Sequence, residues 1–244
     1  MRYKIVFAYD GSLFNGFQIQ DGGRTVQMEI EKALHKVTKE QVTIHASGRT
    51  DTGVHAKGQV AHFDVDFDIS AIDMKNALNS TLPDDIYIRL CNRVSTEFHS
   101  RYGAKSKEYE YLINVGEYNP LLRNYVLQYC RELDVTKMQE AVKYLVGEHD
   151  FSSFVTGLGE TDKDAFRTIY KAQVNIKGSR ISIVLHGSGF LRYMVRGIVG
   201  TLIDVGRGKL NPEDMVSILE KKDRTAAGPN ADACGLYLSN VYYN

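Results

Sequence analysis

Cysteine is scarce in this sequence of 244 residues, and its few thiols are poorly placed for pairing. Cys91, Cys130 and Cys234 are odd in number and lie far apart along the chain. A disulfide framework or a zinc site needs paired or closely spaced cysteines, so both kinds of site are disfavoured. We therefore expect buried, reduced thiols, as in a protein of the cytosol.

The chain also lacks an excess of charge of either sign, because it holds 30 Lys and Arg against 30 Asp and Glu. No global electrostatic field therefore attracts a polyanion, although a local basic face can still bind nucleic acid. No apolar run approaches the roughly 18 residues of a membrane span, and no signal-peptide pattern follows Met1. With 43% hydrophobic residues, the composition predicts a soluble cytosolic protein of one or two globular domains.

Several familiar motifs are missing or incomplete. Gly187-Ser188-Gly189 lacks the third glycine of a dinucleotide-binding loop, and no Walker motif is present. His45, His55 and His62 do not have metal-ligand spacing, and Glu148-His149-Asp150 is more typical of a cap or turn. The chemistry must therefore come from other groups.

Hydrophobic periodicity predicts two successive sets of strands and helices, in halves spanning residues 1–103 and 104–244. We expect strands at residues 2–9, 41–46, 61–67, 86–94, 106–115, 125–131, 168–176, 180–186 and 236–242. We expect helices at residues 25–39 and 70–78, around 138–145, from 191 onward and from 211 onward, and loops at 119–124 and 157–164. This order is typical of a duplicated α+β architecture on antiparallel sheets, although no residue-level repeat is visible.

The run Gly48-Arg49-Thr50-Asp51-Thr52-Gly53-Val54-His55-Ala56 places one carboxylate in a polar segment between an arginine and a glycine. Asp51 is the reactive candidate, because a fixed, ionised carboxylate can act as a nucleophile or stabilise positive charge. Arg49 can bind a phosphate or fill the space that a displaced base leaves. The glycines permit backbone shapes closed to other residues, and the two threonines can fix the loop through backbone hydrogen bonds. The alternative is an ordinary capped turn with an exposed arginine.

Lys105, Lys107, Tyr109 and Tyr111 recur at every second position, so on a strand they share one face. Cations beside aromatic rings suit phosphate contacts combined with base stacking. The alternative is a strand whose tyrosines are core and whose lysines extend to solvent.

Arg192 and Arg196 are spaced by four residues, which places them on one side of the helix expected from residue 191. The stretch from Ile181 to Leu210 is locally basic, which is the nearest feature to a nucleic-acid footprint, although such runs are usually solvated helix faces. Arg196 lies in an apolar stretch, where a half-buried arginine normally needs a carboxylate partner.

The loop motif, followed by Gln59-Val60-Ala61-His62-Phe63-Asp64, resembles the catalytic segment of the TruA family of tRNA pseudouridine synthases. The similarity continues in order over nearly the whole chain. The further matching motifs are Tyr9-Asp10-Gly11, Gly16-Phe17-Gln18-Ile19-Gln20, Thr25-Val26-Gln27, Leu78-Asn79 through Leu82-Pro83, Phe98-His99-Ser100-Arg101, Lys107-x-Tyr109-x-Tyr111, Gly147-Glu148-His149-Asp150-Phe151, Arg167-Thr168-Ile169 and Phe190 through Gly200. Two small departures are Thr52, where Ala is common, and Phe17, where Trp is usual.

The resemblance implies isomerisation of uridine to pseudouridine at positions 38, 39 and 40 of the tRNA anticodon stem-loop, with no metal or organic cofactor. It also implies a homodimer in which two RRM-like (ferredoxin-like) α+β halves share a central antiparallel sheet flanked by helices. By resemblance, Asp51 is the catalytic aspartate, Tyr109 the active-site tyrosine, Arg49 the arginine linked to base flipping, and Arg196 the partner of the aspartate. Lys105, Lys107 and Arg192 are further candidates for binding the tRNA backbone.

Two rival functions fit parts of this pattern. A non-catalytic RRM-like RNA-binding protein would explain the tyrosines and the basic patches, but it would not need the Asp51 loop, and no Phe- and Gly-rich RNP strand is present. A nucleosidase or glycosidase could use Asp51, but such enzymes usually need a second carboxylate as acid, and none is close in the motif.

Overall fold

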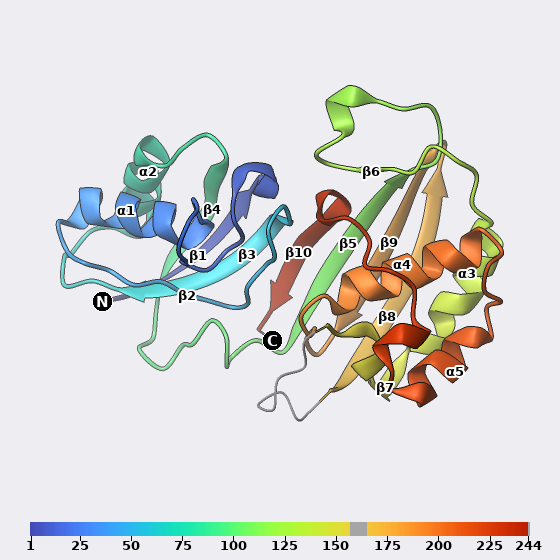
Figure 1. Ribbon diagram of the computed structural model, residues 1–244. Coiled ribbons are helices and arrows are strands. Elements are labelled where there is room, and N and C mark those ends of the chain that lie inside the picture. Colours follow the sequence, from blue (N-terminus) through green and yellow to red (C-terminus); the bar gives the residue numbers. More distant parts are fainter. Residues whose placement is uncertain (157–164, 244) are drawn as a thin grey trace. The chain divides into compact units, whose positions relative to one another are not determined.

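The computed structural model of the chain describes residues 1–156 and 165–243, which form two compact units (Figure 1). The first unit comprises Met1–Lys105 with Tyr237–Asn244, and the second comprises Ser106–Leu236. The border falls close to the one expected after residue 103, but the residues from 237 onward group with the first unit. The loop expected at 157–164 lies outside the described residues.

The sheet of the first unit has the strand order β4-β1-β3-β10, and β2 pairs with β3. The strands are β1 (Arg2–Tyr9), β2 (His45–Ala46), β3 (His55–Asp64), β4 (Ile86–Val94) and β10 (Leu236–Tyr242). Alternate residues of β1 are buried, as the sequence pattern predicts, because one face of the strand packs against the helices. The expected strand at 41–46 is reduced to its last two residues.

Two helices, α1 (Val26–Thr38) and α2 (Ala71–Thr81), cover one face of this sheet (Figure 1). Both begin at the predicted caps: the hydroxyl of Thr25 accepts a hydrogen bond from the amide of Met28 (3.3 Å), and that of Ser70 from Asp73 (3.1 Å). The core of the unit lies between these helices and the sheet. It contains Tyr3, Ile5, Phe7, Ile30, Leu34, Phe63, Met74, Leu78 and Ile88, all fully buried.

The sheet of the second unit has the order β5-β9-β8-β7, and β6 pairs with β5. Its strands are β5 (Ser106–Asn114), β6 (Leu127–Gln128), β7 (Gly147–Asp150), β8 (Phe166–Lys177) and β9 (Arg180–Gly187). The predicted hairpin is confirmed: β8 and β9 pair antiparallel around Gly178-Ser179, where Gly178 takes a φ of 58°. The expected strand at 125–131 shrinks to two residues.

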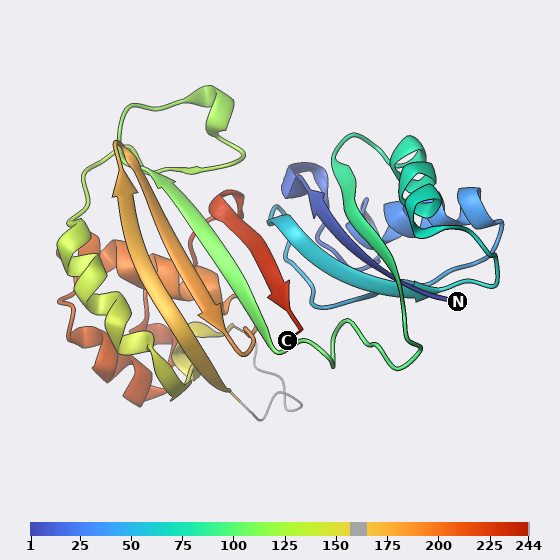
Figure 2. The same ribbon diagram turned by 180° about the vertical axis from the view of Figure 1, so that it is seen from behind.

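Helices α3 (Val135–Ala141), α4 (Met194–Gly206) and α5 (Asp214–Lys221) lie on one side of this sheet, and Figure 2 shows its strands from the other side. Across both units, short 3-10 helices lie at Gly11–Leu13, Pro120–Leu122, Val142–Leu145, Ser152–Phe154, Arg224–Ala226 and Ala233–Gly235. The core under α4 contains Tyr111, Ile113, Ile183, Leu185, Ile198 and Leu202.

The architecture is α+β, with mixed rather than wholly antiparallel sheets. Strand β10 runs parallel to β3, and β6 runs parallel to β5. The expectation of purely antiparallel pairing was therefore wrong at these two places, where no tight hairpin joins the paired strands and fixes their direction. In the described part of the chain, no helix is long and apolar enough to cross a membrane.

Three imidazoles gather beside β3. The ring centroids of His45 and His62 are 5.0 Å apart, and those of His62 and His99 are 4.7 Å apart. Burial is the main cause that lowers the pKa of His62 to about 4. The charges of Arg2 and the other two histidines act in the same direction, and Asp64 opposes them.

We expect the free energy of unfolding to fall as the pH is lowered from about 6.5 to about 4. Folded His62 takes up its proton only near pH 4, whereas in the unfolded chain it does so near its ordinary pKa of 6.5. Protons are therefore taken up on unfolding in this window, and acid favours the unfolded state. Urea unfolding at several pH values measures the effect. A His62→Asn variant should depend less steeply on pH, and equal slopes would assign the loss to other groups.

Candidate active site

Asp51 opens a tight turn between β2 and β3. Its carbonyl accepts a hydrogen bond from the amide of Val54 (3.1 Å), and Gly53 takes a φ of 78° at the third position of this turn. Type II turns need a positive φ there, so the expected use of Gly53 is confirmed. Asp51 itself is half-buried. The turn thus fixes the backbone of the carboxylate at a place that solvent or a substrate can reach.

The segment that follows β1, at Gly16 and Phe17, packs against this turn. The amide of Phe17 donates to the carbonyl of Thr50 (3.1 Å). Gly16, with a φ of 78°, lies so close that an added Cβ would stand 3.2 Å from the carbonyl oxygen of Thr50 and 3.4 Å from the amide nitrogen of Thr52. A side chain at position 16 would therefore press on the Asp51 backbone.

Side chains tie the same two segments together. The phenol of Tyr9 lies 2.7 Å from the hydroxyl of Thr50, and the hydroxyl of Thr52 donates to Oδ1 of Asn15 (3.1 Å). Burial raises the pKa of the Tyr9 phenol, which therefore remains protonated and able to hydrogen-bond. The two threonines were expected to fix the loop through backbone groups. These bonds instead join their side chains to a segment more than 30 residues away.

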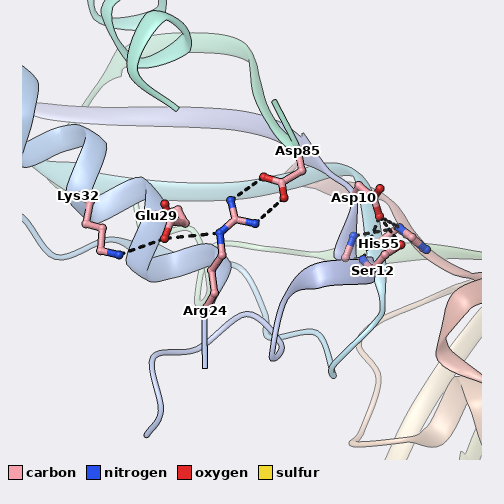
Figure 3. A network of polar contacts seen from close by, with 8 residues as sticks. Asp10, Ser12, Arg24, Glu29, Lys32, His55 and Asp85 are labelled. Carbon is pink, nitrogen blue, oxygen red and sulfur yellow. Dashed lines mark hydrogen bonds and ion pairs between the residues drawn. The ribbon is translucent and has the colours of Figure 1, made fainter. Parts of the chain in front are cut away.

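A second polar network fixes the start of the loop that carries Gly11 (Figure 3). Asp10 accepts hydrogen bonds from the amide (2.9 Å) and hydroxyl (2.6 Å) of Ser12 and lies 3.3 Å from Nδ1 of His55. The amide of Gly11 donates a hydrogen bond to that same Nδ1 (3.0 Å). His55 is therefore a structural histidine that joins β3 to the loop after β1.

Arg24 secures the far end of this loop. Its guanidinium binds both carboxylate oxygens of Asp85, at 2.5 and 2.9 Å (Figure 3). The same guanidinium lies over the ring of Phe14, with its carbon 4.2 Å from the ring centroid. Bidentate arginine pairs are rigid as well as strong. The Asp51 turn thus rests on a loop that is held at both ends.

Arg49 is exposed on the edge of the same loop. Gly48, which was expected to need an unusual backbone shape, has no positive φ. Its carbonyl instead accepts a hydrogen bond from Nε2 of Gln59 (3.0 Å), whose Oε1 accepts from the hydroxyl of Ser47 (2.7 Å). The backbone that precedes Arg49 is therefore fixed by hydrogen bonds, while the side chain of Arg49 is exposed.

In the second unit, Tyr109 lies on β5 and is half-buried, with its ring edge-on to Phe190 at 5.1 Å. Tyr111, two residues on, is fully buried and donates its phenolic proton to the carbonyl of Asp232 (2.7 Å). Burial raises the pKa of Tyr111, a shift that the nearby charge of Arg196 opposes. On this face of the strand, Tyr111 is therefore part of the core, whereas Tyr109 is partly accessible. The alternative that the tyrosines of this strand are core residues is thus correct for Tyr111.

Arg196 lies in the first turn of α4 and is half-buried. Its Nε donates to the carbonyl of Ala231 (2.6 Å), and the amide of Ala231 donates back to the carbonyl of Arg196 (3.0 Å). Its guanidinium carbon lies 5.3 Å from the ring centroid of Tyr193, and that of Arg192 lies 4.9 Å from it.

The expected helical spacing of Arg192 and Arg196 was wrong, because α4 begins only at Met194. Tyr193 takes a left-handed backbone conformation (φ 61°) that sets Arg192 outside the helix. The two arginines nevertheless share one ring, by cation–π contacts rather than by helical position.

The two lysine candidates occupy different environments. Strand β5 begins at Ser106, so exposed Lys105 precedes the strand and does not share the Tyr109 face as predicted; its amide donates to the carbonyl of Tyr242 (2.8 Å). Lys107 lies on the Tyr109 face and is half-buried.

The candidates fall into two groups, each within one unit. Arg49 and Asp51 belong to the first unit, and Tyr109 and Arg196 to the second. Sequence reasoning missed the residues that hold these groups in place: Tyr9, Asn15, Gln59, Phe190 and Tyr193. Gly16 and Gly53, at positions of positive φ, were the available signal.

Comparison with known proteins gives a consistent result. The family described as "tRNA pseudouridine synthase" matches residues 5–103 and 141–244. The chain is 47% identical over its whole length to a tRNA pseudouridine synthase A of Anoxybacillus flavithermus, covering 99% of that protein, and 46% identical to the one of Bacillus subtilis, covering 100% of it. It is 48% identical to tRNA pseudouridine synthase A 1 of Bacillus cereus, with 100% and 99% of the two chains covered. A likeness to a chain of a Cbf5-Nop10-Gar1 complex (TM-score 0.36, 13% identity, 82% of this chain and 54% of that one) is too low to support an argument.

Proposed function

Because this chain belongs to the tRNA pseudouridine synthase family, we propose that it isomerises uridine to pseudouridine in tRNA, at positions 38, 39 and 40 of the anticodon stem-loop. The observation that carries the proposal is the Asp51 turn. A single carboxylate stands on a backbone clamped by Gly16, Phe17 and Gly53 within a chain that matches its relatives from end to end. Preorganisation of this kind is what a catalytic carboxylate needs.

The reaction rearranges one nucleotide without adding or removing atoms. The N1–C1′ bond breaks, the uracil turns, and a C5–C1′ bond forms; the proton on C5 then leaves, and N1 gains one. Bond cleavage builds positive charge on C1′, as in glycoside hydrolysis. We assign the carboxylate of Asp51 to that charge, either as an electrostatic partner or as a nucleophile.

We propose the remaining roles from the family resemblance. By that resemblance, Arg196 is the cation that pairs with Asp51 and would favour its ionised form. Tyr109, which is half-buried with its ring packed edge-on to Phe190, serves as the stacking surface for the uracil and as an acceptor of the C5 proton. Arg49 fills the stack after the target base flips out, which costs a few kcal/mol. Lys105, Lys107 and Arg192 contact the tRNA backbone.

The same inference covers assembly and location. We propose that the two units are RRM-like halves sharing a central sheet, and that the protein acts as a homodimer in the cytoplasm, needing neither metal nor organic cofactor. The family resemblance supports these proposals.

The decisive experiment maps pseudouridine in tRNA from cells that lack the protein. We expect loss at positions 38, 39 and 40 and its return when the wild-type gene is restored. Purified protein incubated with tRNA should form pseudouridine without releasing base. Free uracil among the products would instead identify a nucleosidase, and intact pseudouridine in the deletion strain would refute the assignment.

A further inference from the structure

The turn at residues 99–103 presents the most exposed aromatic ring of the first unit. Tyr102 is 79% exposed, although it lies within a closed turn in which the amide of Gly103 donates to the carbonyl of His99 (2.9 Å). Single exposed rings are common on protein surfaces, so the meaning of this one depends on the groups that hold and surround it.

The ring is supported from below. The ring centroid of Tyr102 lies 4.3 Å from that of His99, whose Nδ1 accepts hydrogen bonds from the amides of Arg101 (3.1 Å) and Tyr102 (3.3 Å). His99 in turn contacts buried His62 on β3 at 4.7 Å. The hydroxyl of Tyr243 fixes the other side of the turn by donating to the carbonyl of Ser100 (2.7 Å). These contacts fix the conformation of Tyr102 in the free protein, so little further conformational entropy is lost when a partner binds.

Arg101 lies beside this ring, and Lys4 lies over two rings close to the same turn. The guanidinium carbon of Arg101 lies 5.8 Å from the Tyr102 centroid, and Nζ of Lys4 lies 5.4 and 5.1 Å from the rings of Phe98 and Tyr243. Lys105 is exposed three residues beyond Tyr102. An exposed aromatic ring with cations beside it matches the chemistry of a nucleotide, which has an aromatic base and an anionic phosphate.

We propose that Tyr102 and Arg101 form a platform on which an unpaired base of the RNA substrate stacks. The positive charges of Lys4 and Lys105 attract the phosphates of that RNA. The substrate class rests on the proposed function, but the platform is separate from the reacting groups. It adjoins His62, seven residues along β3 from His55 at the Asp51 end, which is about 23 Å at the rise of a strand. About seven stacked nucleotides span that distance, so one RNA hairpin can reach both places.

The test compares the affinity of two RNAs for four variants. The RNAs are an anticodon stem-loop and a duplex of the same stem without unpaired nucleotides, and their Kd values are measured by fluorescence anisotropy at one fixed salt concentration. The variants are Tyr102→Ala, Tyr102→Leu, Tyr102→Phe and the control Tyr118→Ala, which removes a tyrosine of the second unit that is 56% exposed. Tyr102→Leu keeps apolar packing on His99 but removes the aromatic face.

We expect Tyr102→Ala and Tyr102→Leu to raise the Kd of the stem-loop about tenfold and that of the duplex less than twofold. Tyr102→Phe and Tyr118→Ala should retain the wild-type Kd, and kcat at saturating RNA should be unchanged in all four. A wild-type Kd for the Ala and Leu variants, or an equal loss on both RNAs, would overturn the proposal. The proposal would also be overturned if the Tyr102 variants differed from the wild-type protein in the mass measured by sedimentation, because the ring would then contact a second copy of the chain. If the wild-type protein bound RNA through Tyr102 but formed no pseudouridine, the proposed function would fail and the platform would stand.

Discussion

Asp51→Asn should abolish pseudouridine formation, lowering kcat at least about a thousandfold, which corresponds to roughly 4 kcal/mol of transition-state stabilisation. The amide keeps the shape of the side chain but removes the negative charge that faces C1′ as the glycosidic bond breaks. The turn should keep its shape, because the positive φ of Gly53 and the hydroxyl contacts of Thr50 and Thr52 all help to fix it. Pseudouridine yield on tRNA in single-turnover experiments measures the effect.

The affinity for tRNA should stay within about threefold of wild type, since a carboxylate repels the phosphate backbone rather than binding it. Asp84→Asn, which neutralises an exposed aspartate of the same unit, is the matched control and should retain full activity. A turnover number for Asp51→Asn within tenfold of the control would remove Asp51 from the chemistry.

Gly11→Ala should disable the enzyme by displacing the Asp51 turn rather than by touching a reacting group. A Cβ at position 11 would stand 2.0 Å from the carbonyl oxygen of Val54, which is backbone that cannot swing aside. We expect the free energy of unfolding to fall by about 2–4 kcal/mol, the usual cost of overpacking a tight site. We also expect a loss of about a hundredfold in kcat, because a shift of about 1 Å is enough to misalign a catalytic group.

Urea unfolding and the activity of the folded fraction separate the two effects. Gly189→Ala is the control, because its new Cβ would meet only the flexible side chain of Arg167, at 3.9 Å. If Gly11→Ala matched this control in both stability and kcat, the contact with Val54 would not be positioning the turn.

The sequence predicted the parts of the fold that depend on neighbouring residues. The caps at Thr25 and Ser70 and the hairpin around Gly178 all occur where the pattern places them. Each is fixed by contacts within a few residues, and such contacts leave a periodic or turn signature. The predictions failed where a distant partner decides the outcome. The parallel partner of β10 lies 182 residues away (Tyr237 pairs with His55), and α4 begins after a left-handed Tyr193 that no local pattern reveals.

The same division holds for the candidate site. The sequence by itself determined which groups are present and in which chemical setting: a carboxylate in a glycine-flanked polar loop, a tyrosine two residues after a lysine on a strand, and an arginine in an apolar helix. Only the tertiary structure decided how the loop is held, through Tyr9, Asn15 and Gly16 against Thr50 and Thr52. It likewise decided that Tyr111 is core while Tyr109 is reachable, and that Tyr102 stands on a stack of histidines. The physical reason is that chemical identity belongs to single residues, whereas position and exposure arise from contacts between segments that the linear order does not join.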